Sequence, residues 1–600
     1  MRQGNISVHT ENIFPIIKKF LYSDHEIFLR ELISNAVDAT QKIKTLASVG
    51  EFKGELGELK ITVTLDEATK TLTISDNGLG MTADDIEKYI NQLAFSGAEE
   101  FVTKYKDKAD ANIIGHFGLG FYSAFMVAHQ VEIQTLSHKE GSEAAHWTCD
   151  GSTSFTIDKG TRTERGTDII LHIAEDSEEF LQKYRVNSLL EKYCRFLPVE
   201  IEFDGKVINN TKPIWIQKPS ELTDDDYTKF YSELYPYAEP PLFWIHLNVD
   251  YPFNLTGILY FPKVSNAIDA EKHKVQLYSN QVFVTDNVKD ILPEFLMLLH
   301  GVIDSPDIPL NVSRSSLQSD SNVKKITSHI SKKVSDKLSD LFKADRKDFD
   351  AKWPSMDIFV KYGMLSDEKF AERAQEFCLL ENVKGEYSLI KEYVEKIKPL
   401  QTNKEETVVA LYTSDPIGQH SYIKAAQDKG YDVLKLDGML DVHFVGQLEQ
   451  KQEKLSVKRV DADIIDKLVD KGEERVSVLT DKDVEKLKTL FSDVADKVKF
   501  SVEAEALSPE ASFITITEDE FARRMREMSR MQNMTMFGNM PDHFKIIINS
   551  NHAKAKKLLE AKGAAKKDMV KQILDLAMLS KNMLTGEHLT DFVNRSMEAV

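Results

Sequence analysis

Cysteine and tryptophan are scarce in this chain of 600 residues, which contains three cysteines and four tryptophans. Cys149, Cys194 and Cys378 are odd in number and widely separated, so they suit neither a disulfide framework nor a set of metal ligands. We interpret them as reduced thiols of a cytoplasmic protein. The sequence also lacks an apolar run long enough to cross a bilayer and a basic-then-apolar segment at its start, so we expect no membrane association.

Positive charge is in short supply as well. The chain has 76 lysines and arginines against 96 aspartates and glutamates, which gives a formal net charge of -20 and a pI near 5.4. The basic surface that would neutralise phosphates is therefore missing, and we expect no binding to nucleic acid. Because 600 residues exceed what one hydrophobic core supports, we expect three or more domains.

A polar stripe runs along the helix that is predicted for residues 28–39. The apolar residues recur at helical spacing, while Glu31, Asn35 and Asp38 follow at i, i+4 and i+7 on a second face. No lysine or arginine lies in that stripe, so groups outside the helix are expected to satisfy its carboxylates. Ser23 and Glu26 have the spacing of a capping box. A face that simply meets water is the commoner explanation of such a stripe, but the segments that follow favour a site.

The first of these segments follows a hairpin. Residues 59–65 and 71–75 alternate apolar and polar residues, so both are predicted strands joined by a turn. Asp76 continues the apolar face of the second strand, where a carboxylate needs a hydrogen-bond donor. Asn77 and Gly78 alone would suit a hairpin turn, but the next residues resemble a helix start. We therefore predict that Gly80 and Met81 line a cavity.

Glycines also recur at the start of residues 115–125. Gly115, Gly118 and Gly120 let the backbone approach a ligand closely, and the apolar run from Phe121 predicts a helix whose first amides face a phosphate. The segment matches neither the Walker nor the Rossmann fingerprint, so alone it is a weak signal. Residues 165–171 predict a turn and a strand, and Thr167 lies at the start of that strand.

In this order the four segments resemble the nucleotide site shared by gyrase, the ninety-kilodalton heat-shock proteins, histidine kinases and the mismatch protein MutL. The sequences of residues 28–39, 75–81 and 115–125 are most similar to those of the ninety-kilodalton heat-shock family. The resemblance continues through residues 244–246 and 257–260 and is strongest at 301–314. It covers essentially the whole chain. Because the long charged insertion of the eukaryotic cytosolic relatives is absent after Pro213, the chain is most similar to the bacterial form.

The resemblance implies a multidomain α+β and α/β fold. It places an N-terminal α/β sandwich ATPase domain at residues 1–215, a linker at 216–226, an α/β middle domain at 227–478 and an α+β C-terminal dimerisation domain at 479–600. From the pattern itself, residues 407–412, 421–429 and 432–436 predict a strand, a helix and a strand with a parallel crossover. The last domain is predicted to have a helix at 482–498, strands near Phe513 and Lys545, and helices near His552, Lys566 and Glu587.

The function that the resemblance implies is that of an ATP-dependent chaperone of the stress response. Such a protein is a homodimer, joined through its C-terminal domain, whose ATPase activity drives closure around unfolded client proteins, in company with other chaperones. ATP and Mg²⁺ are the implied cofactors. Glu31 would orient or deprotonate the attacking water, Asn35 would coordinate magnesium, and Asp76 would accept the adenine amino proton. The rest of the implied site comprises Asp38, Gly80, Met81, Gly115, Gly118, Gly120, Phe121 and Thr167, with Arg314, Asn311 and Gln318 reaching the terminal phosphate from the middle domain.

Two positions depart from the family pattern. Phe95 stands where relatives usually carry a basic residue, in a segment between 91 and 115 that we expect to cover the site. Ser315 stands where they usually carry glutamate, next to Arg314. The family's usual acidic C-terminal tail is absent, so co-chaperone binding through it is not expected.

Two further groups of residues lie in the predicted C-terminal domain. The methionines between 525 and 540 indicate either core packing or, with Arg523, Arg524 and Arg526, an adaptable surface for unfolded chains. The final helices suit a symmetric dimer interface through Leu574, Leu576, Leu579 and Phe592.

Three other functions stay open from the sequence. A DNA-processing clamp shares the nucleotide site but needs basic surface. A histidine kinase needs a phosphorylated histidine upstream of Asn35, where only His9 and His25 exist. A holdase that works without nucleotide is the third.

Overall fold

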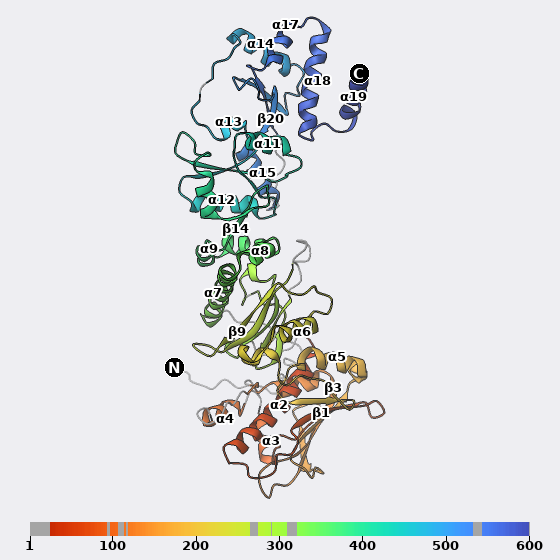
Figure 1. The fold of residues 1–600 in the computed structure, drawn as a ribbon. Helices are drawn as coiled ribbons and strands as arrows, with labels where there is room; N and C mark the ends of the chain where they lie inside the picture. The colour runs from red at the N-terminus through yellow and green to blue at the C-terminus, as the bar shows by residue number, and fades with distance from the viewer. Residues whose placement is uncertain are drawn as a thin grey trace, which may run out of the picture. The chain divides into compact units, whose positions relative to one another are not determined.

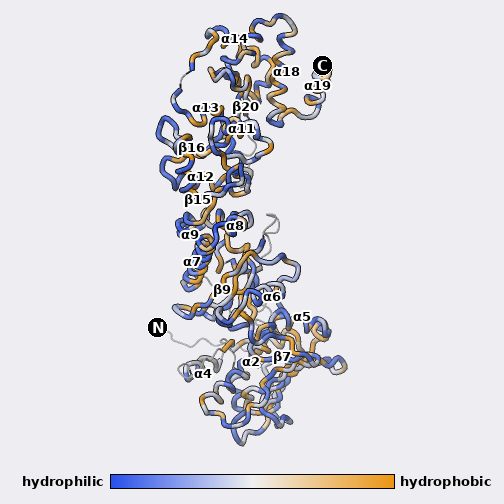
Figure 2. The backbone as a smooth tube through the Cα atoms, viewed as in Figure 1, coloured by the Kyte–Doolittle hydropathy of each residue, from blue (hydrophilic) through white to orange (hydrophobic). Residues whose placement is uncertain are grey.

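The computed structural model describes residues 24–92, 96–105, 113–115, 118–263, 274–289, 291–308, 321–473, 475–531 and 543–598. The chain folds into two compact units, residues 1–334 and 335–600. In Figure 1 the first unit is coloured red to yellow-green and the second green to blue. Along the tube in Figure 2 hydrophobic and hydrophilic residues alternate, as expected of half-buried elements. Among the described residues no helix is both long and apolar enough to cross a membrane.

An eight-stranded sheet underlies the first part of unit 1. Its order is β5-β4-β3-β6-β2-β1-β7-β8, and neighbours are antiparallel except β1 and β7, which run parallel. Strands such as β2 alternate buried and part-buried residues because only one face covers the core. The bounds are β1 (Lys60–Asp66), β2 (Thr71–Asp76), β3 (Ala128–Leu136), β4 (Ala145–Cys149), β5 (Phe155–Lys159), β6 (Gly166–Ile173), β7 (Glu200–Phe203) and β8 (Lys206–Val207).

Helix α2 (Ile27–Ser48) is the central element packed on this sheet. It contacts β1, β2, α5 and the 3-10 helix η3, and both its apolar and its polar stripe are largely buried. Phe28 and Leu32 are fully buried, and each such side chain contributes roughly 2 kcal/mol to stability. The other helices of this part are α3 (Ala83–Tyr89), α4 (Ala98–Tyr105), η3 (Gly120–Met126), η4 (Glu175–Leu181) and α5 (Lys183–Cys194).

A second sheet completes unit 1, in the order β12-β11-β13-β10-β9. Only β11 and β13 run parallel; the other neighbours are antiparallel. An aromatic core that includes Trp215, Tyr231 and Tyr260 covers one face of this sheet. Its elements are η5 (Ile214–Ile216), η6 (Pro219–Glu221), α6 (Asp224–Leu234), β9 (Phe243–Val249), β10 (Leu255–Phe261), β11 (Lys274–Ser279), β12 (Val282–Thr285), η8 (Glu294–Leu296) and β13 (His300–Asp304).

Unit 2 contains a small parallel sheet, β17-β16-β18, with helices around it. Helix α7 (Ser321–Ala344) carries the chain from one unit into the other. The elements that follow are α8 (Arg346–Ser366), α9 (Glu368–Ala374), β14 (Leu379–Glu381), β15 (Tyr387–Leu389), α10 (Ile390–Ile397), β16 (Val408–Thr413), α11 (His420–Asp428), β17 (Val433–Lys435), α12 (Asp441–Lys451), β18 (Leu455–Arg459) and α13 (Ile465–Leu468).

The last part of unit 2 is built on a three-stranded sheet in the order β19-β21-β20. Helices α14 and α18 pack on it through Leu487, Phe491, Val570 and Leu574. The elements are α14 (Asp481–Ser492), β19 (Phe500–Glu505), β20 (Ile514–Glu518), α15 (Glu520–Met531), β21 (Phe544–Asn549), α17 (Ala553–Glu560), α18 (Ala564–Ser580) and α19 (Gly586–Glu598).

The multidomain α+β fold predicted from the sequence is confirmed, including the hairpin β1–β2 and the parallel unit β16–α11–β17. Four local predictions were wrong or incomplete. Helix α2 begins at Ile27, and the carboxylate of Glu26 binds Arg185 and Lys192 instead of capping the helix; Ser23 lies outside the described residues. The run after Gly120 is a 3-10 helix. Helix α14 ends at Ser492, and a turn follows in which Asp496 accepts the amides of Val498 and Phe500. That turn leads into β19, a strand the sequence analysis missed.

Candidate functional site

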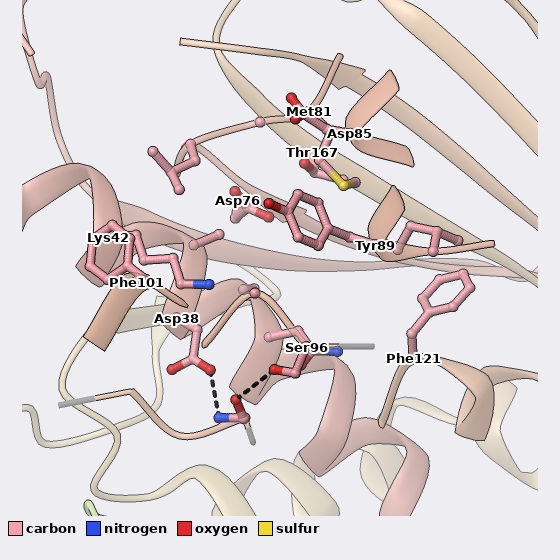
Figure 3. Close-up of a pocket in the computed structure, with 18 of the residues that line it drawn as sticks. Asp38, Lys42, Asp76, Met81, Asp85, Tyr89, Ser96, Phe101, Phe121 and Thr167 are labelled. Carbon is pink, nitrogen blue, oxygen red and sulfur yellow. Dashed lines mark hydrogen bonds between the residues drawn. The ribbon is translucent and has the colours of Figure 1, made fainter. Parts of the chain in front are cut away.

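A cavity of about 610 Å³ opens in unit 1 between α2, α3, α4 and the sheet (Figure 3). Every site residue predicted within the first 215 residues lines it. These residues are Glu31, Asn35, Asp38, Asp76, Gly80, Met81, Gly115, Gly118, Gly120, Phe121 and Thr167. Asn311, Arg314 and Gln318, predicted to reach the same site, lie outside the described residues, as does Phe95.

The carboxylate of Asp38 is held by the segment that contains the first predicted glycine. The amide of Ile114 donates to Oδ1 at 2.7 Å and the amide of Gly115 donates to Oδ2 at 2.7 Å. As predicted, groups outside α2 satisfy this carboxylate. Figure 3 shows the second bond and a contact from Ser96 to the carbonyl of Gly115. Asp38 therefore anchors Gly115, the first residue of the glycine segment (Gly115, Gly118 and Gly120), to α2.

Glu31, one residue of the same stripe, is satisfied differently. Arg30 donates from Nε at 3.0 Å and from Nη2 at 2.8 Å to Oε1 of Glu31. The prediction that no cation of the helix pairs with the stripe was therefore wrong, because the long arginine side chain folds back onto its neighbour. The other oxygen faces the glycine segment: a Cβ on Gly120 would lie 2.9 Å from Oε2. Glycine at position 120 leaves room beside that oxygen.

Asn35 lies between Glu31 and Asp38 on the stripe. Its side-chain oxygen would be 3.6 Å from a Cβ on Gly115, and its nitrogen 3.8 Å from a Cβ on Gly120. The amide therefore sits between the two glycines whose backbones can approach a phosphate most closely. No group of three His, Cys, Asp or Glu side chains in the described parts of the chain is arranged to hold a metal ion.

Asp76 is the buried carboxylate at the sheet side of the cavity. Only 5% of the residue is exposed, and its Oδ1 accepts the amide of Gly78 at 2.8 Å. Burial disfavours the charged form and raises the pKa of Asp76 to about 7, although the hydrogen bond from Gly78 opposes that shift. A buried carboxylate held by backbone amides and facing a cavity suits a ligand that brings a hydrogen-bond donor.

The loop after Asp76 needs glycine at position 80. Its φ is 63°, and a Cβ there would lie 1.8 Å from the carbonyl oxygen of Leu136. The loop is pinned on both sides, since Leu79 accepts the amide of His138 at 2.8 Å and Met81 donates to Thr135 at 2.9 Å. The cavity wall next to Asp76 is therefore fixed to β3.

Sequence analysis missed several residues of the cavity. Lys42 continues the stripe of Asn35 and Asp38 by one more turn of α2, so the spacing could have identified it. Burial lowers the pKa of Lys42, while the charge of Asp38 raises it. Figure 3 shows its ammonium group directed toward the cavity beside Phe101. A cation at the wall of a cavity offers a partner for an anionic group of a ligand.

Helix α4 lies within the segment that was expected to cover the site. Glu51, which follows α2, accepts from Lys104 at 3.1 Å and from the hydroxyl of Tyr105. At the other end of α4, Lys88 pairs with Glu100 at 3.4 Å. Phe101, between these ties, lines the cavity. The helix is thus attached to both α2 and α3 by side chains.

Comparisons with known proteins cover nearly the whole chain. Residues 22–164 match the family described as "Histidine kinase-, DNA gyrase B-, and HSP90-like ATPase", and residues 198–596 match the family described as "Hsp90 protein". Proteins named "Chaperone protein HtpG" from Bacteroides thetaiotaomicron and Porphyromonas gingivalis are 50% and 49% identical over 100% and 99% of both chains. A "TNF receptor-associated protein 1 homolog, mitochondrial" from Dictyostelium discoideum is 30% identical over 97% of this chain and 83% of its own length.

Proposed function

The chain belongs to the Hsp90 protein family and is an ATP-dependent chaperone with an ATPase domain, and from this premise we propose how its residues bind and hydrolyse ATP. The observation that carries the proposal is the placement of Asp76, Glu31 and the glycine segment around one cavity. A buried acceptor suits a base, whereas glycine backbones and a cation suit phosphates. The cavity volume of about 610 Å³ is within the range of small-molecule sites.

Asp76 accepts the amino proton of adenine in this proposal. Backbone amides of Gly78 and Thr167 already bond this carboxylate, and burial makes a ligand without a donor for it costly to bind. Thr167 and Met81 flank the same end of the cavity (Figure 3). Gly118, Gly120 and Phe121 surround the phosphates with backbone amides, and Gly115, whose own amide is donated to Asp38, lets the backbone approach them closely.

Mg²⁺ would neutralise phosphate charge and polarise the terminal phosphate. We assign Asn35 to it because the side-chain amide lies between Gly115 and Gly120, where phosphate oxygens would be. Magnesium keeps most of its ligands as waters and phosphate oxygens, so one protein ligand is consistent with the donor set.

Glu31 is proposed to orient or deprotonate the attacking water. Arg30 occupies Oε1, which leaves Oε2 directed toward the glycine segment for that water. Arg314, supported by Asn311 and Gln318, supplies a permanently charged fork for the terminal phosphate. Hydrolysis then requires the docking of the segment that carries Arg314. ATP drives this change only through its higher affinity for the closed state.

The domain boundaries at 215, 226 and 478 are part of the same proposal, as are the partners. We propose a homodimer joined through residues 479–600, with unfolded client proteins held between protomers and other chaperones handing clients over. A cytoplasmic location is supported by the three cysteines, which are buried and unpaired by disulfides. The proposal that the methionine-rich segment is an adaptable surface is weakened, because Arg523, Arg524 and Arg526 are held in ion pairs by glutamates. Met534, Met536 and Met540 lie outside the described residues.

Protection of a heat-unfolded client protein tests this function. The full chain should suppress aggregation and release folded client only when ATP is present, with phosphate released in parallel. Equal protection with and without ATP, and no phosphate release, would instead indicate a holdase that does not use nucleotide. DNA added as competitor should have no effect at low salt.

A further inference from the structure

The turn between β11 and β12 has an unusual backbone. Asn280 and Gln281 form a two-residue connection with φ values of 50° and 65°. Positive φ at both positions is the type I′ turn that fits the twist of a hairpin. Asparagine tolerates this conformation, but glutamine does so less readily, so the turn needs support from outside.

Asp304, at the end of β13, supplies that support. Its Oδ2 accepts the amide of Gln281 at 2.9 Å and the indole N–H of Trp215 at 3.2 Å. Asp304 is 5% exposed and Trp215 is fully buried. Burial raises the pKa of Asp304 to about 6, and these donors oppose the shift. The backbone of the turn is therefore fixed within the second sheet of unit 1.

The side chain of Asn280 reaches the residues that precede Gly115, which lines the cavity. Its Nδ2 donates to the carbonyl oxygen of Ile113 at 3.3 Å, and it makes no other side-chain hydrogen bond within the described part of the chain. That carbonyl and the amide of Ile114 belong to one peptide group. The same peptide group donates to Asp38 at 2.7 Å. One peptide is thus held from one side by the second sheet and from the other by α2.

Hydrogen bonds on both ends of a peptide group strengthen one another. Asp38 is one turn of α2 beyond Asn35 and two turns beyond Glu31. A shift of this peptide group therefore changes what faces all three side chains of the polar stripe. The hairpin of β11 and β12 also makes apolar contacts with the hydrophobic core around α2. Val282 is buried in that core, and the ring centres of Phe283 and Tyr193 lie 5.9 Å apart. These apolar contacts do not depend on the amide of Asn280.

We infer that Asn280 is a positioning residue for ATP hydrolysis, which couples the second sheet of unit 1 to the glycine segment and, through Asp38, to Glu31 and Asn35. The inference rests on the proposed function of this cavity. It assigns to Asn280 the regulation of turnover by the docked state of the hairpin, separately from nucleotide affinity, because the hydrogen bonds that hold Asp76 and the loop around Gly80 come from other residues.

The test compares Asn280→Asp with Asn287→Asp in the full chain. The first change keeps the turn backbone and removes the donor; the second is the same chemical change at an exposed asparagine beyond the same hairpin. Loss of one hydrogen bond of about 1 kcal/mol should lower kcat for ATP about fivefold in Asn280→Asp, with KM changed less than about twofold. Amide hydrogen exchange at Ile114 and Gly115 should become faster. Asn287→Asp should change none of these.

The outcomes separate the two claims. If Asn280→Asp fails to fold, Asn280→Gly carries the test, because glycine adopts positive φ and also lacks the donor, and the same loss of kcat is expected. If the wild-type chain hydrolyses ATP and Asn280→Asp or Asn280→Gly has the same kcat, the positioning role is overturned and the proposed function stays intact. The same holds if amide exchange at Ile114 and Gly115 is unchanged in the variant. A wild-type chain that binds no ATP and releases no phosphate would overturn the proposed function itself.

Discussion

Arg30 donates two hydrogen bonds to the same oxygen of Glu31, its neighbour on α2. Arg30 is almost completely buried, and its guanidinium also lies 5.8 Å from the ring centre of Tyr193. Charge-assisted bonds of this kind fix the direction of a carboxylate. Arg30 therefore occupies Oε1, and Oε2 is the oxygen that we propose acts on the water, which makes the role of Glu31 specific enough to test.

Glu31→Ala should bind ATP and fail to hydrolyse it. Removal of a general base lowers turnover by at least about 100-fold, while the base and the phosphates keep their contacts. Calorimetry for affinity and phosphate release for turnover measure the two effects. Glu87→Ala, at an exposed glutamate of α3, is the matched control and should behave as wild type. Preserved turnover in Glu31→Ala would remove Glu31 from its role.

Asp76→Asn should weaken nucleotide binding by at least about 100-fold, since a buried acceptor is replaced by a group that places a donor beside the adenine amino group. Isothermal calorimetry with ADP reports this directly. Asp250→Asn makes the same change at an exposed aspartate of unit 1 and should retain full affinity. Normal ADP affinity in Asp76→Asn would contradict the adenine assignment.

The same substitution should stabilise the nucleotide-free protein near neutral pH. The pKa of Asp76 is raised to about 7 in the folded state from its ordinary value of 3.8, so the folded state binds more protons than the unfolded state between these values. Stability from this group is therefore lost as pH rises from 3.8 to 7, by up to about 1.4 kcal/mol per pH unit. Urea unfolding of Asp76→Asn and wild type should show a gap that widens from pH 5 to pH 7. A gap that does not depend on pH would contradict the raised pKa.

Arg314→Ala should slow hydrolysis and leave ATP affinity largely intact. An arginine that meets the terminal phosphate in the transition state is worth roughly 10³-fold in rate. Single-turnover measurements with saturating ATP isolate that step. Arg373→Ala, at an exposed arginine of α9, controls for the loss of a surface charge. Equal single-turnover rates in wild type and Arg314→Ala would mean that this arginine does not reach the phosphate.

Local periodicity was enough to find α2 and the hairpin β1–β2, two of the elements that build the cavity. The spacing of Glu31, Asn35 and Asp38 predicted the stripe on α2, and strand alternation placed Asp76 on the core face. Lys42 was available from the same spacing and was overlooked. The site alone could not separate a chaperone from a kinase or a gyrase, because all three share the family that matches residues 22–164. The match over residues 198–596 makes that distinction.

Contacts that depend on side-chain length or on tertiary packing could not be predicted in this way. Adjacent residues on a helix do not face each other, so nothing in the spacing indicated that Arg30 would reach Glu31. The bond from Asn280 to Ile113 joins residues far apart in sequence, and no local pattern predicts it. Strand β19 was missed because its alternation of Phe500, Val502 and Ala504 with polar residues is short and follows a helix pattern.

Gly80→Ala should be strongly destabilising. A Cβ at this position would overlap the carbonyl oxygen of Leu136, and the backbone cannot move away because the loop is pinned to β3. Gly57→Ala is the matched control, since its φ of 64° is equally unfavourable for alanine but nothing lies within 4 Å of the new Cβ. The control should lose about 1–2 kcal/mol of unfolding free energy, and Gly80→Ala more than about 3 kcal/mol. Equal losses would show that the close approach to β3 does not matter.

The final helices leave apolar side chains uncovered, and we expect a second copy of the chain to cover them. Leu574 and Phe592, both named as interface residues from the sequence, are buried within unit 2, whereas Leu576 is 50% and Leu579 39% exposed. Helix α18 therefore has one apolar face for its own core and a second apolar face that this chain leaves exposed.

A symmetric interface uses each side chain twice, so Leu576→Glu buries two unpaired carboxylates. Sedimentation velocity should show a dimer dissociation constant raised by at least about 100-fold. Leu400→Glu, at a leucine that is 49% exposed elsewhere in unit 2, should leave the dimer unchanged. An intact Leu576→Glu dimer would place the interface outside α18.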